Sequence, residues 1–569
     1  MLTRLMVALA LVFSLGAAAE PVRFTVEGLD GELARNVELY LKQLPDLEPA
    51  QVRGYRDGIR LKVEQALQAL GHYNPHVDII HRADAPGEVR VAVQAGEPVR
   101  YRSVDIQLLG EAGDDDAFQA LLAQSQVRLG AVLNHPHYDD LKAGLTTLAL
   151  HRGYFDGTWQ LSEVRVHPRE NAADVTLHYQ GGRRYRFGEL NIDSDRPVAS
   201  ILASIQVLEP GQPYLAAKLA ELSRALSATG YFQQVLVRPQ LDEARDGTVP
   251  LKVSLKAKAD NQVEVGIGVS TDEGPRTSLK WRKPWINDAG HSLGSEFKVS
   301  APRQELSLDY RIPRGDPRLQ FYSLQGGFQR LHLEDTDSRR STAAIHRFDK
   351  QEEGWNRDLF IRAEYETYTQ ADQEDRSFLL IPGISFERIR LRGGIDPHWG
   401  DSQILTLEFS ERKWGSDARF VRAWGRSKWL RSLGDRHRVI ARIEQGAVWV
   451  DEVTELPPSL RFFTGGDNTV RGFGYRTIGP RDADGELVGG KYSTALGLEY
   501  DYRFADRWRV AAFVDGGTAT NDYQDDWKLG TGLGLRWLTP IGPIRFDLAF
   551  GVSEVHVPWR LHFAMGAVL

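Results

Sequence analysis

From Gln262 onward, segments of roughly ten residues alternate between apolar and polar or small side chains, and this pattern constrains the fold more than any other feature. In residues 492–504, the clearest case, one face is apolar and aromatic. The other face carries Ser493, Ala495, Gly497, Glu499, Asp501 and Arg503. A period of two residues is typical of a β-strand between two different surroundings. Lipid on one side and a wet interior on the other would produce it.

Composition separates this region from the rest of the chain. Residues 1–260 contain one tryptophan and 20 glycines, whereas residues 261–569 contain 12 tryptophans and 34 glycines. Tryptophan at bilayer interfaces and glycine in strands and turns are typical of a membrane barrel. Past the first 20 residues no apolar run approaches the roughly 18 residues of a membrane helix. The chain has no cysteine, which excludes disulfides and Cys-ligated metals, and its net charge of −7 gives no reason to expect nucleic acid as a partner.

The N-terminus has the pattern of a secretory signal. Arg4 supplies a positive start, residues 5–15 are apolar apart from Ser14, and residues 17–19 are alanines. Small residues at these positions are typical of a signal peptidase site, so we expect cleavage after Ala19. The remainder of the chain is then exported.

A barrel explains the alternation better than a soluble sandwich does. Aromatic residues stand at strand ends, for example Trp508, Trp537 and Trp559, where an interface girdle would lie. Only a closed barrel satisfies the backbone hydrogen bonds of strands in lipid. At roughly ten residues per crossing plus loops, residues 262–569 accommodate about 14 to 18 strands.

The first 260 residues contain a repeat. Gly71-His72-Tyr73, Gly153-Tyr154-Phe155 and Gly230-Tyr231-Phe232 each follow a helical pattern, at spacings of 82 and 77 residues. A glycine after the last helical turn can adopt the left-handed conformation that ends a helix. Two strands follow each motif, and one strand precedes each helix pair. The repeating unit is therefore β-α-α-β-β, about 80 residues long.

This repeat resembles the POTRA (polypeptide-transport-associated) domain, and the resemblance covers residues 22–260. Three unrelated small α+β domains are the alternative. We predict a signal peptide (1–19), POTRA-like domains at 22–96, 97–182 and 183–260, and an outer-membrane β-barrel at 262–569.

The most specific segment contains Val470-Arg471-Gly472-Phe473, which is similar to the V-R-G-F/Y signature of the BamA/TamA superfamily of outer-membrane assembly proteins. Phe513-Val514-Asp515-Gly516-Gly517 is similar to the F-x-D-x-G strand motif of the same family. Three POTRA-like units, rather than the five of BamA or the two of two-partner secretion transporters, resemble the TamA branch. The resemblance implies a 16-stranded antiparallel transmembrane β-barrel in the outer membrane, with the POTRA domains in the periplasm.

The two motifs also suggest a physical contact. The alternation places Glu499 and Asp515 on the inner wall, where Arg471 could bind them with its planar, permanently charged fork. Gly472 has no side chain and would let the loop approach the wall closely. The family places this loop inside the barrel as a lid; a solvated outward turn is the alternative. The predicted site comprises the lid motif Val470, Arg471, Gly472 and Phe473 and the wall residues Glu499, Phe513, Asp515 and Gly517.

The family further implies a lateral seam, where the first and last strands pair weakly and can separate. Glycine weakens strand pairing, and we assign Gly266, Gly268 and Gly566 to this seam. An opened seam would present backbone groups to an incoming strand.

The sequence shows no enzyme motif, and we expect neither catalysis nor a cofactor. The resemblance implies nascent outer-membrane proteins such as autotransporters as clients, contact with outer-membrane lipids, and a TamB-like inner-membrane-anchored partner docking on the first repeat. Three alternatives remain open: a two-partner secretion transporter, a passive porin, and lipid transport to the outer membrane.

Overall fold

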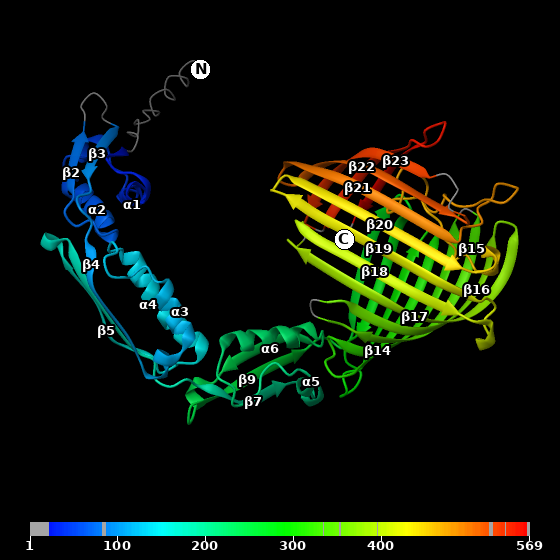
Figure 1. Ribbon diagram of the computed structural model, residues 1–569, viewed down its shortest axis with the longest axis horizontal. Helices are drawn as coiled ribbons and strands as arrows, with labels where there is room; N and C mark the ends of the chain where they lie inside the picture. The colour runs from blue at the N-terminus through cyan, green and yellow to red at the C-terminus, as the bar shows by residue number, and fades with distance from the viewer. Residues whose placement is uncertain are drawn as a thin grey trace, which may run out of the picture. The chain divides into compact units, whose positions relative to one another are not determined.

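The computed structural model describes residues 22–81, 87–333, 335–351, 354–394, 396–522, 527–540 and 542–565. The predicted signal peptide, residues 1–19, and the predicted seam residue Gly566 lie outside these ranges. The chain forms two compact units, one containing most of the small α/β domains and the other containing the barrel (Figure 1). Among the described residues, no helix combines the length and the apolar character needed to cross a bilayer.

Three small mixed sheets come first along the chain, as the repeat predicts. In each sheet the last strand of the repeat lies in the middle, giving the orders β1-β3-β2, β4-β6-β5 and β7-β9-β8. In the first two sheets this middle strand pairs parallel with the opening strand and antiparallel with the other strand. The POTRA-type β-α-α-β-β order is therefore confirmed.

The first repeat consists of β1 (Arg23–Glu27), α1 (Gly31–Leu41), α2 (Arg56–Ala69), β2 (His76–His81) and β3 (Glu88–Gln94). The second consists of β4 (Arg100–Leu109), α3 (Asp116–Gln124), α4 (His135–Arg152), β5 (Thr158–His167) and β6 (Ala172–Gln180). The third consists of β7 (Arg186–Ser194), α5 (Ala199–Ser204), α6 (Ala216–Ala228), β8 (Phe232–Pro239) and β9 (Thr248–Ala257).

The Gly-aromatic motif ends a helix and fills the core of its domain. Gly153 caps α4 in the left-handed conformation, with φ of 87°. The next residue, Tyr154, is buried and packs edge-on against Phe118, with the ring centroids 5.4 Å apart. Its hydroxyl donates to Asp115 at 3.0 Å, which satisfies the one polar group that the ring brings into the core.

Sixteen strands, β10 to β25, form a closed antiparallel barrel (Figure 1). The strand number agrees with the one that the family resemblance implies. The strands of the first half are β10 (Gln262–Ser270), β11 (Gly274–Lys283), β12 (Ser292–Ser300), β13 (Arg303–Pro313), β14 (Gln320–Leu333), β15 (Thr336–Asp349), β16 (Asn356–Gln370) and β17 (Gln373–Arg392). Those of the second half are β18 (Trp399–Ser410), β19 (Phe420–Leu433), β20 (His437–Trp449), β21 (Tyr492–Ala505), β22 (Trp508–Thr520), β23 (Lys528–Thr539), β24 (Gly542–Gly551) and β25 (Trp559–Met565).

The barrel faces follow the alternation read from the sequence. On β21 Glu499 and Asp501 are 8% and 0% exposed, whereas Tyr500 between them is 42% exposed. The outer surface carries the expected aromatics: Trp508 and Trp537 stack face to face, with centroids 5.3 Å apart. The barrel therefore presents an apolar outer face to lipid and a polar inner face to its lumen.

Candidate functional site

The connection between β20 and β21, residues 450–491, folds back against inward-facing residues of the barrel wall. Thr464, Val470 and Arg471 in this connection are each at most 3% exposed. Backbone hydrogen bonds between Phe462 and Gly490 and between Thr464 and Ile478 join its two halves. We call residues 456–491 the lid.

The tip of the lid is held by Arg471. Its Nε donates to Asp515 at 2.7 Å, and its Nη1 donates to Glu499 at 2.6 Å and to Asp547 at 3.2 Å. The guanidinium carbon lies 3.4 Å from the ring centroid of Phe513, which gives a cation–π contact as well. The structure therefore brings Arg471 together with three of the four wall residues predicted from the sequence.

Three further charged residues complete this cluster and were not assigned to the site from the sequence. Arg442 binds Asp515 at 2.8 Å and donates to the lid carbonyl of Thr469 at 2.6 Å. Arg536 bridges Glu499 at 2.9 Å and Asp547 at 2.6 Å. Three arginines thus alternate with three carboxylates, so the buried charges balance. In the sequence Asp547 alternates with the apolar Phe546 and Leu548, which predicts an inner-face position, but only cross-strand register brings it to Arg471.

Glycines make the close fit of lid and wall possible. Gly472 has φ of 97°, and a Cβ there would lie 2.9 Å from the backbone of Phe550 and Gly551. On the wall, a Cβ on Gly517 would lie 2.8 Å from a methyl group of Val470, and one on Gly551 would lie 2.9 Å from the Phe473 ring. The remaining predicted site residues therefore also meet across the lid–wall contact.

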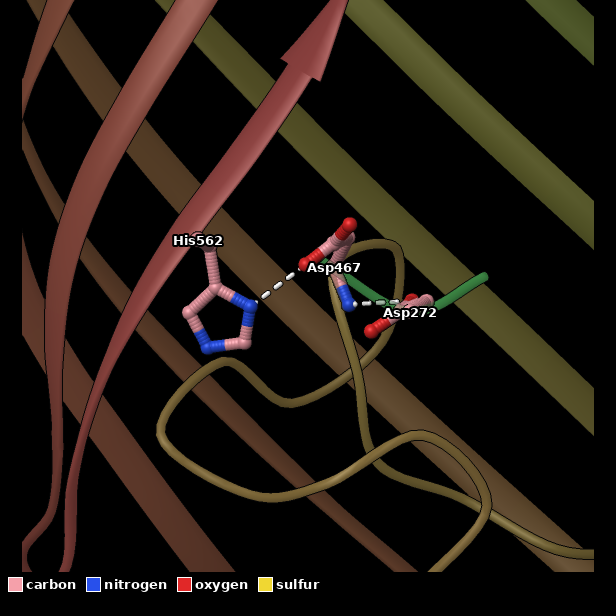
Figure 2. Close-up of side chains that lie close together, drawn as sticks. All are labelled: Asp272, Asp467 and His562. Atoms are coloured by element: carbon pink, nitrogen blue, oxygen red, sulfur yellow. Dashed lines mark hydrogen bonds and ion pairs between the residues drawn. The ribbon is translucent and has the colours of Figure 1, made fainter. Parts of the chain in front are cut away.

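A second contact joins the lid to both sides of the seam, the turn after β10 and the strand β25, and Figure 2 shows its three side chains. The backbone N–H of Asp467 in the lid donates to Asp272, in the turn after β10, at 2.9 Å. The carboxylate of the same residue, Asp467, lies 2.5 Å from Nδ1 of His562 on β25. Gly472 donates its N–H to His562 Nε2 at 3.0 Å, so Nδ1 must carry the ring proton and donate to Asp467. We call Asp272, Asp467 and His562 the latch.

Hydrogen bonds among the described residues explain why the three latch side chains lie so close together. The three ligand atoms lie within 4.8 Å of one another, close enough to share one cation. Both ring nitrogens of His562 are already used, and Asp272 and Asp467 each accept a hydrogen bond. Burial, followed by the nearby charge of Asp467, raises the pKa of Asp272 to about 7. A protonated Asp272 beside an ionised Asp467 avoids like-charge repulsion in this small space.

Few backbone contacts join the first and last strands at the predicted seam. Within the described residues, β10 and β25 share a single register pair, Ser270 with Ala564, whereas β10 and β11 pair along their full lengths. Thr271 adds a bond from its N–H to the carbonyl of Phe563 at 3.1 Å. The predicted glycines Gly266 and Gly268 lie on β10, where they leave room for Ser278 and Arg276 of β11.

The base of the lid, residues 456–462, is held in a different way. Leu456, Leu460 and Phe462 belong to a buried apolar cluster with side chains from β17, β19 and β20. The wall members of that cluster include Leu379, Ile381, Phe420 and Val448. The hydroxyl of Ser459 adds a hydrogen bond of 3.0 Å to Glu364 on β16.

These features define a class of protein: an outer-membrane barrel with POTRA domains and an internal lid fixed by an arginine. A family model described as the Omp85 superfamily domain matches residues 258–567, and a second, described as the POTRA domain TamA domain 1, matches residues 23–95. The chain belongs to the Omp85 superfamily, and the family and fold place it in the outer membrane with its POTRA domains in the periplasm.

Two curated relatives are similar over most of this chain. It is 23% identical over 435 residues to the outer membrane protein assembly factor BamA of Nitratidesulfovibrio vulgaris, covering 71% of this chain and 54% of that protein. It is 21% identical over 480 residues to BamA of Neisseria meningitidis, covering 69% of this chain and 58% of that protein. The chain thus spans little more than half the length of either relative.

A solved structure shares the fold. The crystal structure of BamA from Haemophilus ducreyi lacking POTRA domains 1–3 superposes with a TM-score of 0.70 at 15% identity, covering 82% of this chain and 99% of that structure. At this identity the likeness concerns the fold alone.

Proposed function

We propose that this chain is the outer-membrane component of a translocation and assembly module, which assists the insertion of outer-membrane proteins such as autotransporters. The single observation that carries the proposal is the latch: one lid residue, Asp467, contacts both the turn after β10 and His562 on β25. A lid tied to both strands of the seam can report on the state of the seam and respond to it. The similarity to proteins named as assembly factors supports the same function.

The mechanism needs no covalent chemistry and no cofactor. When β10 and β25 separate, their facing N–H and C=O groups are exposed and can pair with a strand of an incoming client. The closed seam loses little when it opens, because the described parts of the two strands share one register pair. While the seam is open, Arg471 still binds carboxylates of β21, β22 and β24. The lid therefore stays attached to the wall on the β25 side of the seam.

A disulfide across the seam tests this function. The chain has no cysteine, so Ser270→Cys with Ala564→Cys places one new pair at the register contact of β10 and β25. Opposed residues of antiparallel strands lie about 4.5–5.5 Å apart, which suits a disulfide. We expect the oxidised variant to stop assembling an autotransporter in vivo and the reduced variant to recover.

The matched control is Ser493→Cys with Ala519→Cys, a Ser–Ala register pair on the inner face of β21 and β22, away from the seam. This crosslink should leave assembly unchanged. Full assembly by the oxidised seam variant would contradict the proposal.

We further propose that the first POTRA domain docks a TamB-like periplasmic partner. Residues 23–95 match the model of a TamA POTRA domain, and β1 and β2 form the two edges of its sheet. An exposed edge can accept an additional strand. Deletion of residues 22–95 should abolish co-purification of the partner while the barrel still assembles; undiminished co-purification would refute this docking site.

A further inference from the structure

A cluster of four arginines lies on the outward face of β17 to β19, far along the wall from the lid. Arg388, Arg390 and Arg392 alternate along the end of β17, and Arg431 lies near the end of β19. Their register partners on β18 are Gln403, Asp401 and Trp399. Apolar residues continue the same face, since Phe386 pairs with Leu405, whose side chain is 45% exposed. We call these four residues the arginine patch.

Topology places the arginine patch at the periplasmic end of the barrel. β10 follows directly from the periplasmic domains, and each later strand reverses direction. β17 and β19 therefore both end on the periplasmic side. The turn after β17 is fixed there, because Asp396 accepts hydrogen bonds from Arg438 at 3.0 Å and from Arg509 at 2.9 Å.

The patch carries excess positive charge. Among the outward-facing positions at this end of β17, β18 and β19, the one carboxylate is Asp401, which is buried and receives a two-point contact from Arg390 at 3.0 and 2.8 Å. Arg431 lies 3.6 Å from the same carboxylate. Arg388 instead donates to Gln403, and Arg392 stacks on Trp399. Four permanent charges thus face one counter-charge at the edge of a lipid bilayer.

Trp399 organises the arginines before any ligand binds. The guanidinium carbons of Arg390, Arg392 and Arg431 lie 5.3, 4.9 and 4.6 Å from its ring centroid. Trp355 gives Arg388 a similar platform at 4.7 Å. Tryptophan residues on a barrel surface stand at the level of lipid headgroups. The stacked guanidinium groups are therefore held where phosphates of the periplasmic leaflet lie.

An apolar groove of about 740 Å³ continues from the patch along the outer face of β18 to β20. It starts at Trp355 and Gln403, both of which contact Arg388. Small residues on β19 form its floor: Ala423, Gly425 and Ser427. An acyl chain has the shape and polarity to fill such a groove.

We propose that the arginine patch and this groove bind one acidic phospholipid of the periplasmic leaflet, with the phosphodiester headgroup on the arginines and an acyl chain in the groove. Arginine forks match phosphate oxygens, and basic clusters at a membrane surface select anionic headgroups. The arginine patch lies away from the seam and the latch, and the groove opens on the outer face of the wall. The site can therefore exist whether or not the proposed assembly function holds.

Photolabelling of the full chain tests the site. The protein is reconstituted in vesicles of three parts phosphatidylethanolamine to one part phosphatidylglycerol, with a trace of photoreactive phosphatidylglycerol, and labelled peptides are identified by mass spectrometry. We expect labels to concentrate on residues 386–433. Arg388→Gln with Arg392→Gln should lower this labelling on the order of thirtyfold, because each arginine near a membrane adds about fivefold to anionic-lipid affinity. In that variant Asp401 still forms its ion pairs with Arg390 and Arg431, so the buried carboxylate is not left without a counter-charge.

The matched control is Arg330→Gln with Arg339→Gln, a register pair of exposed arginines at the opposite end of β14 and β15. It should leave labelling of residues 386–433 unchanged. Unlabelled phosphatidylglycerol should compete, whereas phosphatidylethanolamine and inorganic phosphate should not. Should the double variant fail to give the heat-modifiable band of a folded barrel, Arg392→Gln alone should lower labelling severalfold. Even labelling around the barrel, labelling that survives either patch variant, or equal competition by phosphate or phosphatidylethanolamine would overturn the proposal.

Discussion

The base and the tip of the lid are two ends of one loop held by opposite kinds of force. At the base, Leu456, Leu460 and Phe462 are buried in an apolar cluster with β17, β19 and β20. At the tip, Arg471 forms ion pairs with carboxylates of β21, β22 and β24. Apolar burial is non-directional and contains no charges that salt could screen or a proton could neutralise. Ion pairs depend on geometry, and each can be exchanged for water or for another partner.

This difference suggests a division of labour within the lid. The base fixes the loop inside the barrel, while the tip can be released and captured again without loss of the core. The latch lies on the tip side, because Asp467 precedes Arg471 by four residues and Gly472 donates to His562. A change at the seam therefore reaches the charged end of the lid first. The following predictions test whether the two ends are separable.

The largest effect is expected for Arg471→Ala. Removal of the guanidinium leaves Glu499, Asp515 and Asp547 with fewer buried counter-charges, and breaking a buried ion pair in this way costs about 3–5 kcal/mol. We expect the tip to leave the wall, limited proteolysis to cut within residues 464–475, and assembly activity to fall. Proteolysis of the folded barrel and an autotransporter assembly assay would measure both.

Arg471→Lys is the control, because lysine keeps the charge but cannot form the planar fork. It should lie between wild type and Arg471→Ala in both assays, and its protease sensitivity should rise with salt. An alanine variant that resists protease and assembles normally would show that the tip needs no ion pair.

At the base, Leu460→Ala should destabilise the barrel by about 2–5 kcal/mol, because it leaves a cavity in the apolar cluster. We expect a lower thermal unfolding temperature, little dependence on salt, and continued protection of residues 464–475. Leu405→Ala, at a 45% exposed outward position, is the control and should change less. If Leu460→Ala exposed residues 464–475 to protease as much as Arg471→Ala does, the base and the tip of the lid would not be separable.

The sequence gives the periodic parts of this structure and misses contacts that depend on three-dimensional register. Period two identified the inner faces of β21, β22 and β24, and the repeated Gly-aromatic motif identified the three small domains. Arg442 and Arg536 also stand on inner faces, but their distance from Arg471 along the chain hides the contact. His562 also stands on an inner face, but its contact with the lid depends on β25 returning beside β10. Arg388, Arg390 and Arg392 stand two residues apart in the sequence, but only the register of β17, β18 and β19 shows that Trp399 and Arg431 lie beside them.

Close packing at the tip should also matter, though less than charge. A Cβ on Gly530 would lie 1.9 Å from the carbonyl oxygen of Arg471, so Gly530→Ala must displace the lid backbone. Overpacking of this kind costs about 1–3 kcal/mol. We expect moderate protease sensitivity at residues 464–475 with every charge of the tip still present.

Gly516→Ala is the matched control on the same strand pair. A Cβ there would meet the end of the flexible Leu529 side chain at 3.1 Å, on the lipid-facing surface. It should behave as wild type in the protease assay. Equal sensitivity of the two variants would mean that loss of glycine in these strands, rather than contact with the lid, causes the effect.

The smallest predicted effect is a pH dependence of the latch. The unfolded chain releases the Asp272 proton near pH 4, whereas burial and the charge of Asp467 raise the pKa of this group to about 7 in the fold. The native state therefore keeps a proton that the unfolded chain has lost, and this stabilisation disappears as the pH rises through 7. Between pH 6 and pH 8 the loss is about 1.4 kcal/mol. We expect the lid tip to become more sensitive to protease over this range.

Asp272→Asn should flatten that pH profile, because the amide cannot ionise. Asp484→Asn, at an exposed position of the lid, should leave the wild-type profile in place. Two results would contradict this assignment. One is a wild-type lid with the same protease sensitivity at pH 6 and pH 8, and the other is an Asp272→Asn variant whose protease sensitivity still rises over this range. The difference between the tip and the base of the lid would then rest on the ion pairs of Arg471, whose guanidinium stays charged between pH 6 and pH 8.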